Sequence, residues 1–474
     1  MALVLLGATT SARTVAFGAS EESKPVSVAG WEKCFAFHYD YVLAETAGVR
    51  RDFEPVEVTL TVPDPGARRW YDHVRVVRLE SNDRGRLVPH QTLREVAAIP
   101  AVPDKAKAPA PVRSVNVIFL ARCPARAETT YRLFWGLPDG AETATANLPT
   151  ASVKGGLQIS GKIPALTVAN EHYTIQLDPK CGAIKNARRA GQGPDELMRI
   201  RQNIPMHFGT DVWSPPQTWD HDFNWPVPPN QRQEGGSIAL RYHRWGPMKT
   251  FRDVTTSITY TFYAHVPYIH VSSTLEFTAN RSARAVRIGE IVVSHPTKPT
   301  PDGKETDKKI PQVFSHFAWP EEDGRVTTRE IAAIQDAEGW SNVPGLARGA
   351  VGVLERDVPW IAGYHAKKAY GIAALRRSQF VGNRLGGPIP HTAPCTYVAK
   401  YHMEFSYWSR PMVYPLGLKG TPLDQNTAIA AGTVFATEEA LLIFEPDPTL
   451  RQVRDAHCQF TKPLRFRFKG TGPW

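Results

Sequence analysis

The chain has 474 residues, and its 56 lysines and arginines against 46 aspartates and glutamates give a net charge of +10 at pH 7. Hydrophobic residues at 42% and charged residues at 22% are typical of a soluble globular protein. No segment reaches the roughly 18 to 20 apolar residues that span a bilayer, which excludes a membrane-spanning helix.

The positive charge favours an acidic partner: nucleic acid, anionic lipid or acidic polysaccharide. The basic residues are scattered apart from pairs such as Arg50-Arg51 and Arg376-Arg377, without a basic arm, a basic helix or a nucleic-acid motif. We therefore expect an acidic polysaccharide or oligosaccharide and no nucleic acid, with a generally basic, solvated surface as the alternative. The sequence leaves the oligomeric state open.

The first 20 residues are compatible with an export signal. Met1 to Ala8 is short and apolar, and small residues follow near Ala16 to Ala19, although no cationic residue precedes the apolar run. The protein would then be secreted or periplasmic.

Many strands joined by turns are expected from 40 prolines, 35 glycines and scarce long periodic segments. In residues 54–62, Val56, Val58 and Leu60 alternate with polar residues, which is the period of a half-buried strand. Similar runs cover residues 74–79, 115–120 and 130–135. They predict an N-terminal β-sandwich domain over residues 25–145, followed by a small polar linker and a boundary near residue 160.

The clearest local pattern is a hairpin within residues 166–184. Tyr173, Ile175 and Leu177 share one face of a strand, Asp178-Pro179 opens a turn, and Gly182 supplies a flexible φ before the return strand.

This run, Asn-Glu-x-Tyr-x-Ile-x-Leu-Asp-x-x-x-Gly-x-Ile, resembles the opening hairpin of the galactose-mutarotase-like β-supersandwich. That domain occurs in aldose epimerases, in the C-terminal halves of many glycosidases and in some polysaccharide lyases. The resemblance implies a sugar-active or sugar-binding domain over residues 160–474, and a fold by itself assigns no reaction.

Later segments supply enough strands for two large sheets. Residues 257–263 and 268–277 alternate apolar and polar residues, as one long antiparallel pair would. Further strands are expected at 351–354, 360–364, 371–376, 397–407 and 433–444, and the best short helix at 328–337. The predicted fold class is mostly β: an N-terminal β-sandwich packed on a larger antiparallel β-supersandwich, with few short helices.

The region from Met206 to Met248 holds four of the twelve tryptophans among histidines, aspartates and prolines. Aromatic rings stack on sugars while carboxylates and imidazoles bind hydroxyls, so we predict a glycan site. The alternative is a loop closed over the sandwich edge as a small satellite core. The predicted substrate-binding residues are Trp213, Trp219, Asp220, Asp222, Trp225 and Trp245. The predicted catalytic residues are His207, His221, Tyr242 and His243.

A second cluster lies in residues 401–410. If this segment is extended, His402 and Trp408 share a face with Arg410. We predict His402 and Arg410 as catalytic residues and Trp408 as a substrate-binding residue, and the alternative is a solvent-facing strand with a Glu404 to Arg410 ion pair. His316 has aromatic neighbours and is predicted to bind substrate, or else is a structural histidine.

We predict no metal site and no cofactor. Asp220-His221-Asp222 could ligate a divalent cation with His207 or His243, but no second spaced motif accompanies it. The chain also lacks a GxSxG elbow, a P-loop, a GxGxxG fingerprint and an HExxH motif, which disfavours several enzyme classes.

The preferred hypothesis is a polysaccharide lyase that cleaves a uronic-acid-containing glycan by β-elimination. That reaction needs an arginine to neutralise the carboxylate and a histidine or tyrosine as base and acid. The alternatives are a non-catalytic glycan-binding protein and a glycoside hydrolase with paired carboxylates.

Overall fold

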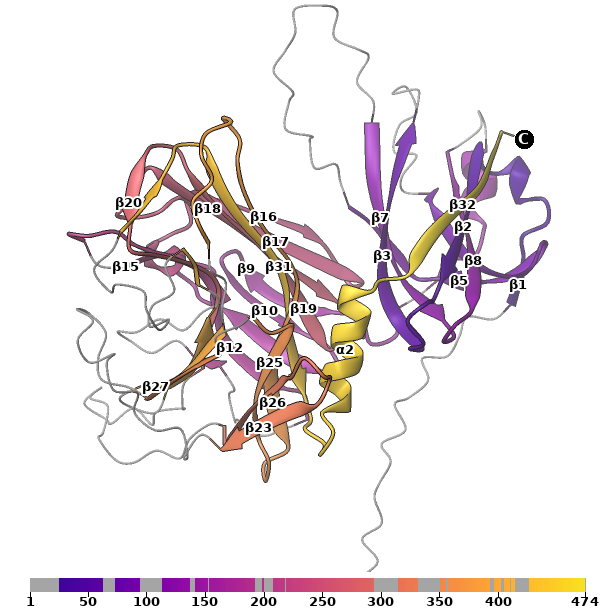
Figure 1. Cartoon of the computed structure of the whole chain (residues 1–474). Helices are drawn as coiled ribbons and strands as arrows, with labels where there is room; N and C mark the ends of the chain where they lie inside the picture. The colour runs from indigo at the N-terminus through magenta and orange to yellow at the C-terminus, as the bar shows by residue number, and fades with distance from the viewer. Residues whose placement is uncertain are drawn as a thin grey trace, which may run out of the picture.

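A computed structural model gives the fold of the chain (Figure 1). It describes residues 25–62, 73–93, 113–136, 141–151, 153–191, 198–199, 208–217, 219–293, 314–330, 350–354, 357–392, 396–401, 405–409, 411–413 and 426–473. The predicted export signal, residues 1–20, lies outside these ranges. The α-helices are α1 (Glu142–Ala146) and α2 (Arg451–Thr461), and 3-10 turns cover Trp31–Lys33 and Asp222–Asn224. No helix in the described ranges is long and apolar enough to cross a bilayer.

The first unit is a sandwich of two antiparallel sheets. One sheet has the order β1 (Pro25–Ser27), β5 (Arg84–Val88), β4 (Arg75–Ser81), β8 (Glu128–Trp135), β2 (Phe37–Ala44) and β32 (Arg465–Pro473). The other has the order β3 (Arg51–Val62), β7 (Arg113–Cys123) and β6 (His90–Leu93). The alternating residues Val56, Val58 and Leu60 pack in the core between the sheets, with Val76 and Leu133 from the other side.

The second unit is larger, and its centre is a nine-stranded sheet. Its order is β16 (Asn230–Gly235), β17 (Ala239–Pro247), β18 (Val254–Tyr263), β19 (Tyr268–Phe277), β31 (Thr433–Phe444), β26 (Tyr370–Asn383), β25 (Trp360–His365), β22 (His316–Pro320) and β23 (Val326–Glu330). The long pair predicted from residues 257–277 is β18 and β19, in register from Val254 opposite Phe277.

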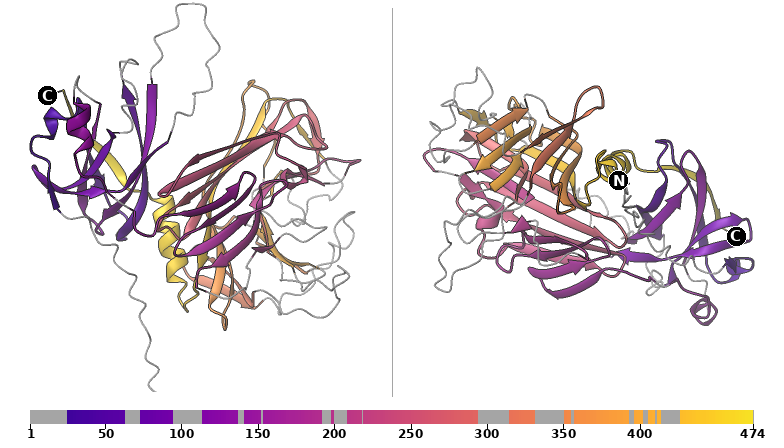
Figure 2. Two further views of the ribbon diagram at one scale, coloured as in Figure 1. Left: turned by 180° about the vertical axis from the view of Figure 1, so that it is seen from behind. Right: turned by 90° about the horizontal axis from the view of Figure 1, so that it is seen from below.

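Two smaller sheets cover the inner face of the nine-stranded sheet. A five-stranded sheet has the order β13 (Met198–Arg199), β12 (Ile184–Arg189), β11 (Tyr173–Leu177), β10 (Ala165–Ala169) and β9 (Gln158–Lys162). A seven-stranded sheet has the order β15 (Trp219–His221), β14 (Phe208–Trp213), β21 (Ala285–Val293), β28 (Phe405–Ser409), β27 (Thr396–Tyr401) and β24 (Ala350–Leu354), with β29 (Pro411–Val413) beside β21. A short ribbon pairs β20 (Arg281–Ala283) with β30 (Thr427–Ile429). Figure 2 shows these layers from behind and from below.

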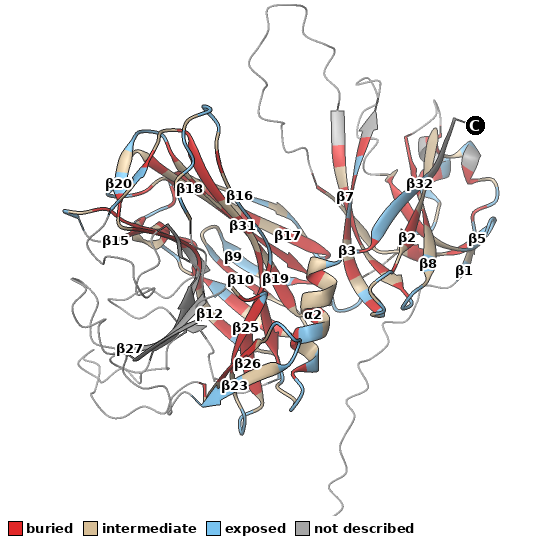
Figure 3. Cartoon of the chain, in the orientation of Figure 1, coloured by how far each residue is buried: buried red, intermediate tan, exposed pale blue. Residues whose placement is uncertain are grey.

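The layers are held by continuous apolar cores. Val168 and Ile175 of the five-stranded sheet pack with Val271 of the nine-stranded sheet. Val212 and Leu275 belong to a second core between the seven- and nine-stranded sheets. The buried stretches coloured red in Figure 3 follow these inner faces. The predicted fold class, a mostly β chain with an N-terminal sandwich packed on a larger supersandwich, is confirmed.

Two details differ from the sequence predictions. Residues 326–330 form strand β23, so the helix expected from residue 328 does not begin there, because β23 pairs with β22 along its whole length. The end of the chain also leaves the second unit: β32 pairs with β2, from Phe37 opposite Pro473 to Ala44 opposite Arg465, and completes the first sandwich.

The hairpin of β11 and β12 has the turn that its sequence predicts. The carboxylate of Asp178 accepts bonds from the main-chain N–H groups of Lys180 (2.8 Å) and Cys181 (3.2 Å), and Gly182 adopts φ +71°. A Cβ atom at Gly182 would overlap the hydroxyl of Tyr242, which is fully buried. Position 182 therefore needs glycine for two reasons: its positive φ, and the lack of space for a Cβ atom beside Tyr242.

We expect Gly182→Ala to cost more stability than Gly191→Ala. Gly191 has φ +74° but open space around its Cβ position, so it should lose only about 1 kcal/mol to backbone strain. Gly182→Ala should lose about 1 to 3 kcal/mol more, because the core around Tyr242 must shift. Chemical denaturation of the two variants measures the difference, and equal losses would show that Tyr242 moves aside freely.

The two units meet at helix α2, which lies between them (Figure 1). Leu93 and Ile118 of the first sandwich share a core with Leu450 and Val453 at the start of α2. Beyond this core, polar bonds such as that between Arg241 and Glu57 (2.9 Å) join the units directly.

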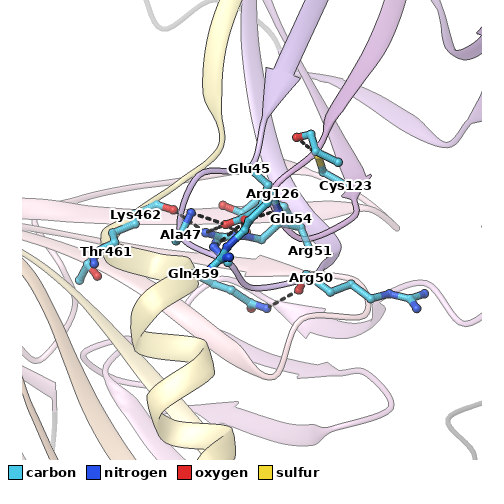
Figure 4. Close-up of polar contacts among 12 residues, drawn as sticks. Glu45, Ala47, Arg50, Arg51, Glu54, Cys123, Arg126, Gln459, Thr461 and Lys462 are labelled. Atoms are coloured by element: carbon cyan, nitrogen blue, oxygen red, sulfur yellow. Dashed lines mark hydrogen bonds and ion pairs between the residues drawn. The ribbon is translucent and has the colours of Figure 1, made fainter. Parts of the chain in front are cut away.

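A buried ion cluster marks this junction (Figure 4). Arg51 donates to the carboxylate of Glu45 (3.0 Å) and to the main-chain oxygen of Lys462 (2.7 Å), just after α2. Glu54 lies 3.4 Å from the same guanidinium, and all three charged side chains are at most 5% exposed. Burial opposes ionisation of Glu45, but the N–H of Arg126, Arg51 and two further main-chain N–H groups lower its pKa to about 2. One buried cation thus faces two carboxyl groups.

Candidate functional site

One row of side chains crosses three strands of the seven-stranded sheet. Asp211 of β14 lies opposite both His221 of β15 and Arg287 of β21 in register. Residues paired on antiparallel strands project from the same face, so the three side chains meet. The preceding Thr210 bonds Thr256 of the nine-stranded sheet at 2.8 Å, which places the Asp211 row on the face directed away from that sheet.

The carboxylate of Asp211 is fully buried and binds two cationic or polar groups. It accepts a bond from Nε of Arg287 (2.8 Å), and its Oδ2 lies 3.2 Å from Nδ1 of His221. Burial opposes ionisation, but Arg287 and then His221 outweigh it and hold the pKa of Asp211 well below its usual range. An aspartate at Nδ1 orients an imidazole and favours the tautomer in which Nε2 can accept a proton. The His221 side chain is 19% exposed, so it reaches solvent.

Aromatic rings continue the row on both sides. The guanidinium of Arg287 lies 3.9 Å from the ring centre of Trp219, and Trp219 packs against Trp213 with 5.4 Å between ring centres. His221 stacks on Phe223 at 4.3 Å with an angle of 19°. Stacked rings cover part of each other's faces, so His221 is presented as a hydrogen-bonding edge group beside the half-buried Trp219. We name Asp211, Trp219, His221 and Arg287 the His221 row.

The other predicted residues of β15 and the following turn are buried and bonded inside the protein. Asp220 accepts bonds from Asn224 (2.9 Å) and from the main-chain N–H groups of Thr250 and Phe251 (2.5 and 3.0 Å). Trp225 is 3% exposed and donates its indole N–H to the oxygen of Pro247 at 2.8 Å. These contacts close the turn over the sheet edge.

Asp222 forms a buried ion pair with Arg244 of β17, and both side chains have 0% exposure. Asp220 and Asp222 are both fully buried and bonded inside the protein, while the side chain of His221 is on the other face of β15, so the triplet does not converge on one point. Within the described part of the chain, no three histidine, cysteine, aspartate or glutamate side chains are grouped so as to hold a metal ion.

Three further predicted residues lie on β17, in the nine-stranded sheet. Tyr242 is buried in the core and donates to Gln231 at 3.0 Å. His243 and Trp245 project from the opposite, outer face and stack on each other at 4.3 Å. The structure therefore separates His243 and Trp245 from the His221 row by the thickness of the sandwich. It does not assemble the predicted residues of this region in one place.

The two segments singled out in the sequence do meet in one sheet. β14 pairs with β21, and β21 pairs with β28 and β29, so that Trp408 lies opposite Ile291 and Pro411 opposite Arg287. The side chain of Trp408 and the predicted catalytic residues His207, His402 and Arg410 lie outside the described residues.

His316 is remote from His243 and Trp245 on β17, and it is not on the sheet that carries the His221 row. It lies on β22, near the end of the nine-stranded sheet opposite to β17, where it stacks on Tyr364 at 5.3 Å and contacts the hydroxyl of Ser315 at 2.7 Å. Whether any of the predicted residues binds or converts a substrate stays a prediction.

Sequence reasoning missed the charged partners inside the sandwich. Arg376 of β26 lies 3.4 Å from Glu439 of β31 and 3.2 Å from Asp357, and both Arg376 and Glu439 are 1% exposed. Gly289 of β21 has φ +78° and has no side chain where the Glu439 carboxylate packs. The available signal was a charged residue between apolar neighbours, as Arg287 is between Val286 and Ile288.

Comparisons with known proteins complete the description. No family model matches the sequence, and no curated protein matches it. Among solved structures, the chain is similar to an α-mannosidase from Enterococcus faecalis, with 10% identity over 92% of this chain and 47% of that one and a TM-score of 0.49. It therefore spans about half the length of that protein.

Galactose-mutarotase-like proteins are also among these structures. A galactose mutarotase related enzyme from Lactobacillus acidophilus is 10% identical over 60% of this chain and 98% of its own, with a TM-score of 0.33. A putative mutarotase from Salmonella typhimurium is 7% identical over 64% of this chain and 99% of its own, with a TM-score of 0.34. Proteins of the type that the hairpin resembles are thus similar to this chain at low identity.

Proposed function

We propose that the protein is a carbohydrate-active enzyme that cleaves a uronic-acid-containing glycan by β-elimination at the His221 row. The observation that carries the proposal is the placement of His221 on the buried carboxylate of Asp211, with part of the imidazole in solvent beside Trp219. A positioned imidazole is the most common general base in enzymes.

In this proposal Nε2 of His221 removes the proton from C5 of the uronate. The C5–H electron pair forms the C4=C5 double bond as the C4–O bond breaks. The leaving oxygen takes up a proton from water, and the imidazolium returns its proton to the solvent. Asp211 holds the Nδ1 side of the ring and stabilises the imidazolium that forms. Trp219 provides an apolar wall for the sugar.

The carboxylate of the uronate must also be neutralised. Arg287 is bonded to Asp211, so we assign this task to Arg410, which the sequence predicts as a catalytic residue. A guanidinium suits it because it can bind a carboxylate through two parallel bonds.

A second candidate is a non-catalytic glycan-binding protein. It is favoured because Arg287 is engaged by Asp211, while Trp219 beside it can still stack on a sugar without any acid or base. Such a protein would bind acidic glycans and form no product. A glycoside hydrolase receives less support, because Asp211, Asp220 and Asp222 are fully buried and engaged with protein donors. The fourth candidate carboxylate, Glu276, is on β19 of the nine-stranded sheet and is paired with Arg384.

The test uses the full chain and a broad panel of acidic polysaccharides, with ultraviolet absorbance recording the C4=C5 double bond. We expect product from at least one polymer, and a decrease in rate of at least about 100-fold in His221→Asn, as is usual when a general base is lost. His391→Asn, at an exposed histidine, is the matched control and should keep the wild-type rate. Binding without product across the panel would replace the enzyme by the binding protein, and a fully active His221→Asn would refute the assigned base.

A further inference from the structure

The outer face of the nine-stranded sheet carries a row of small side chains between two aromatic rings. Trp245, Ser257, Thr274, Ala436 and Phe380 follow one another in register across β17, β18, β19, β31 and β26. Four intervals between strands make this row about 19 Å long. The three middle residues and Trp245 are half-buried, while Phe380 is 59% exposed.

A second row runs beside the first, two residues along each strand. It consists of His243, Thr259, Ser272, Glu438 and Ser378, all of them at least partly exposed. We call the two rows together the hydroxyl face. The next row along these strands contains His270 and Ala440, where α2 covers the sheet: the ring of Phe460 lies 5.4 Å from that of His270. Helix α2 thus covers the row of His270 and Ala440, and the hydroxyl face is the part of the sheet next to that row.

The composition of the hydroxyl face differs from that of an ordinary solvated sheet surface. Such surfaces commonly carry polar and charged side chains. Here the ten positions hold five serines and threonines, one alanine and a single acidic residue. The arginines that border them are paired: Arg232, opposite His243 on β16, lies 2.7 Å from Glu234, and Arg377 contacts Glu438. Backbone and short hydroxyl groups are thus within reach of a molecule lying across the strands.

The charges around the face are balanced in pairs. Glu438 lies 3.4 Å from Arg377, and Glu276 lies 3.1 Å from Arg384, at the side of Phe380. On the other side Arg241 bonds Glu57. Burial, with Arg232 and Arg241 nearby, lowers the pKa of His243 to about 4, so the imidazole is uncharged at pH 7 and contacts the hydroxyl of Ser257 at 2.8 Å. The face as a whole presents hydroxyl groups, a neutral imidazole and aromatic rings. Because its charged groups are paired, it has no net charge that would attract an ionic ligand.

From this geometry we infer that the hydroxyl face binds an uncharged polysaccharide chain that lies across the strands. Sugar hydroxyls would bond the serines, threonines and His243, and the rings of Trp245 and Phe380 would contact sugars at the two ends. This face is directed away from the seven-stranded sheet and thus from the His221 row. The inference does not depend on the proposed reaction, and the ligand is neutral where that substrate is acidic.

The experiment is affinity electrophoresis of the full chain in gels that contain soluble neutral polysaccharides, namely glucan, mannan, galactomannan and xylan, or polygalacturonate. We expect at least one neutral polymer to retard the wild type. The double variant Ser272→Lys with Thr274→Lys, which puts long charged side chains in the middle of the face, should weaken this affinity at least tenfold, and so should Phe380→Ser.

Thr328→Lys, at an exposed position of β23 in the same sheet, is the matched control and should bind as the wild type does. A thermal melt of each variant confirms that it is folded, and Phe380→Ser gives an independent reading if the lysine variant unfolds. No retardation by any neutral polymer, retardation by polygalacturonate alone, or unchanged binding by folded variants would overturn the inference. The His221 activity assay is separate, so each proposal can fail alone.

Discussion

Replacement of Arg244 by leucine is expected to lower the free energy of unfolding by about 3 to 5 kcal/mol, because it leaves the carboxylate of Asp222 buried without its cation. Both side chains have 0% exposure. Arg244 also donates to the main-chain oxygen of Cys181 (3.2 Å) and to the hydroxyl of Tyr260 (3.2 Å). This one guanidinium therefore joins β17, the turn after β11 and the 3-10 turn after β15.

Urea denaturation measures the effect. Arg467→Leu is the control, since Arg467 pairs with Glu128 on the surface with side chains 66% and 55% exposed, and its loss should cost less than about 1 kcal/mol. Adding Asp222→Asn to Arg244→Leu should recover part of the lost stability, because the uncompensated charge is gone while the amide oxygen can still accept from the N–H of Thr210. If Arg244→Leu alone were as stable as Arg467→Leu, the prediction would be contradicted.

The second large effect concerns pH and the junction between the two units. Burial raises the pKa of Glu54 to about 7, and the opposing attraction of Arg51 and the N–H of Leu464 does not outweigh it. A carboxyl group whose pKa is higher in the folded state than in the unfolded state binds a proton on folding. Its stabilising contribution is complete below pH 4.5 and is lost as the pH rises to about 7. The shift corresponds to about 3 kcal/mol.

Glu54→Gln should remove this dependence, since an amide resembles the protonated acid and does not titrate. We expect the variant to equal the wild type near pH 4.5 and to exceed its stability by about 3 kcal/mol at pH 8. The quantity to measure at each pH is the difference in free energy of unfolding between Glu54→Gln and the wild type, because contributions that both proteins share then cancel. Burial lowers the pKa of His90 and His270 to about 4, and such histidines give the opposite slope over the same pH range.

Glu128→Gln, at an exposed glutamate, serves as the control and should follow the wild type at every pH. A difference between Glu54→Gln and the wild type that does not change between pH 4.5 and 8 would show that Glu54 is ionised throughout. The result would also show whether Arg51 binds one carboxylate or two (Figure 4).

Local pattern was sufficient for much of the fold. Strict alternation along residues 257–277 predicted β18 and β19 with their apolar and polar faces, because a strand with one buried face needs a period of two. The hairpin around Gly182 followed from its turn residues, which fix the backbone locally. By contrast, the helix expected from residue 328 was wrong at its start, since pairing with β22 overrides a weak local propensity.

The candidate site depended more on distant partners. The sequence singled out His221 and the aspartates next to it, but Arg287 comes from a strand 76 residues beyond Asp211. Arg244 lies in the same region as Asp222, 22 residues further on, and its pairing was not predicted. Trp225 and Trp245 both occur within residues 206–248, yet one is buried in a turn and the other is on the outer face of the nine-stranded sheet. Which partner stands opposite a side chain is set by strand register, and no local period encodes it.

By itself, then, the sequence determined a mostly β chain of two units, a glycine turn that opens the second unit, and the concentration of histidine, tryptophan and aspartate in residues 206–248. Only the tertiary structure decided that Asp211, His221 and Arg287 form one row, that Asp220 and Asp222 are internal, and that His243 is on another surface. The physical reason is that side-chain alternation is a property of each strand alone, whereas the pairing of strands and the stacking of sheets depend on contacts between segments distant in sequence.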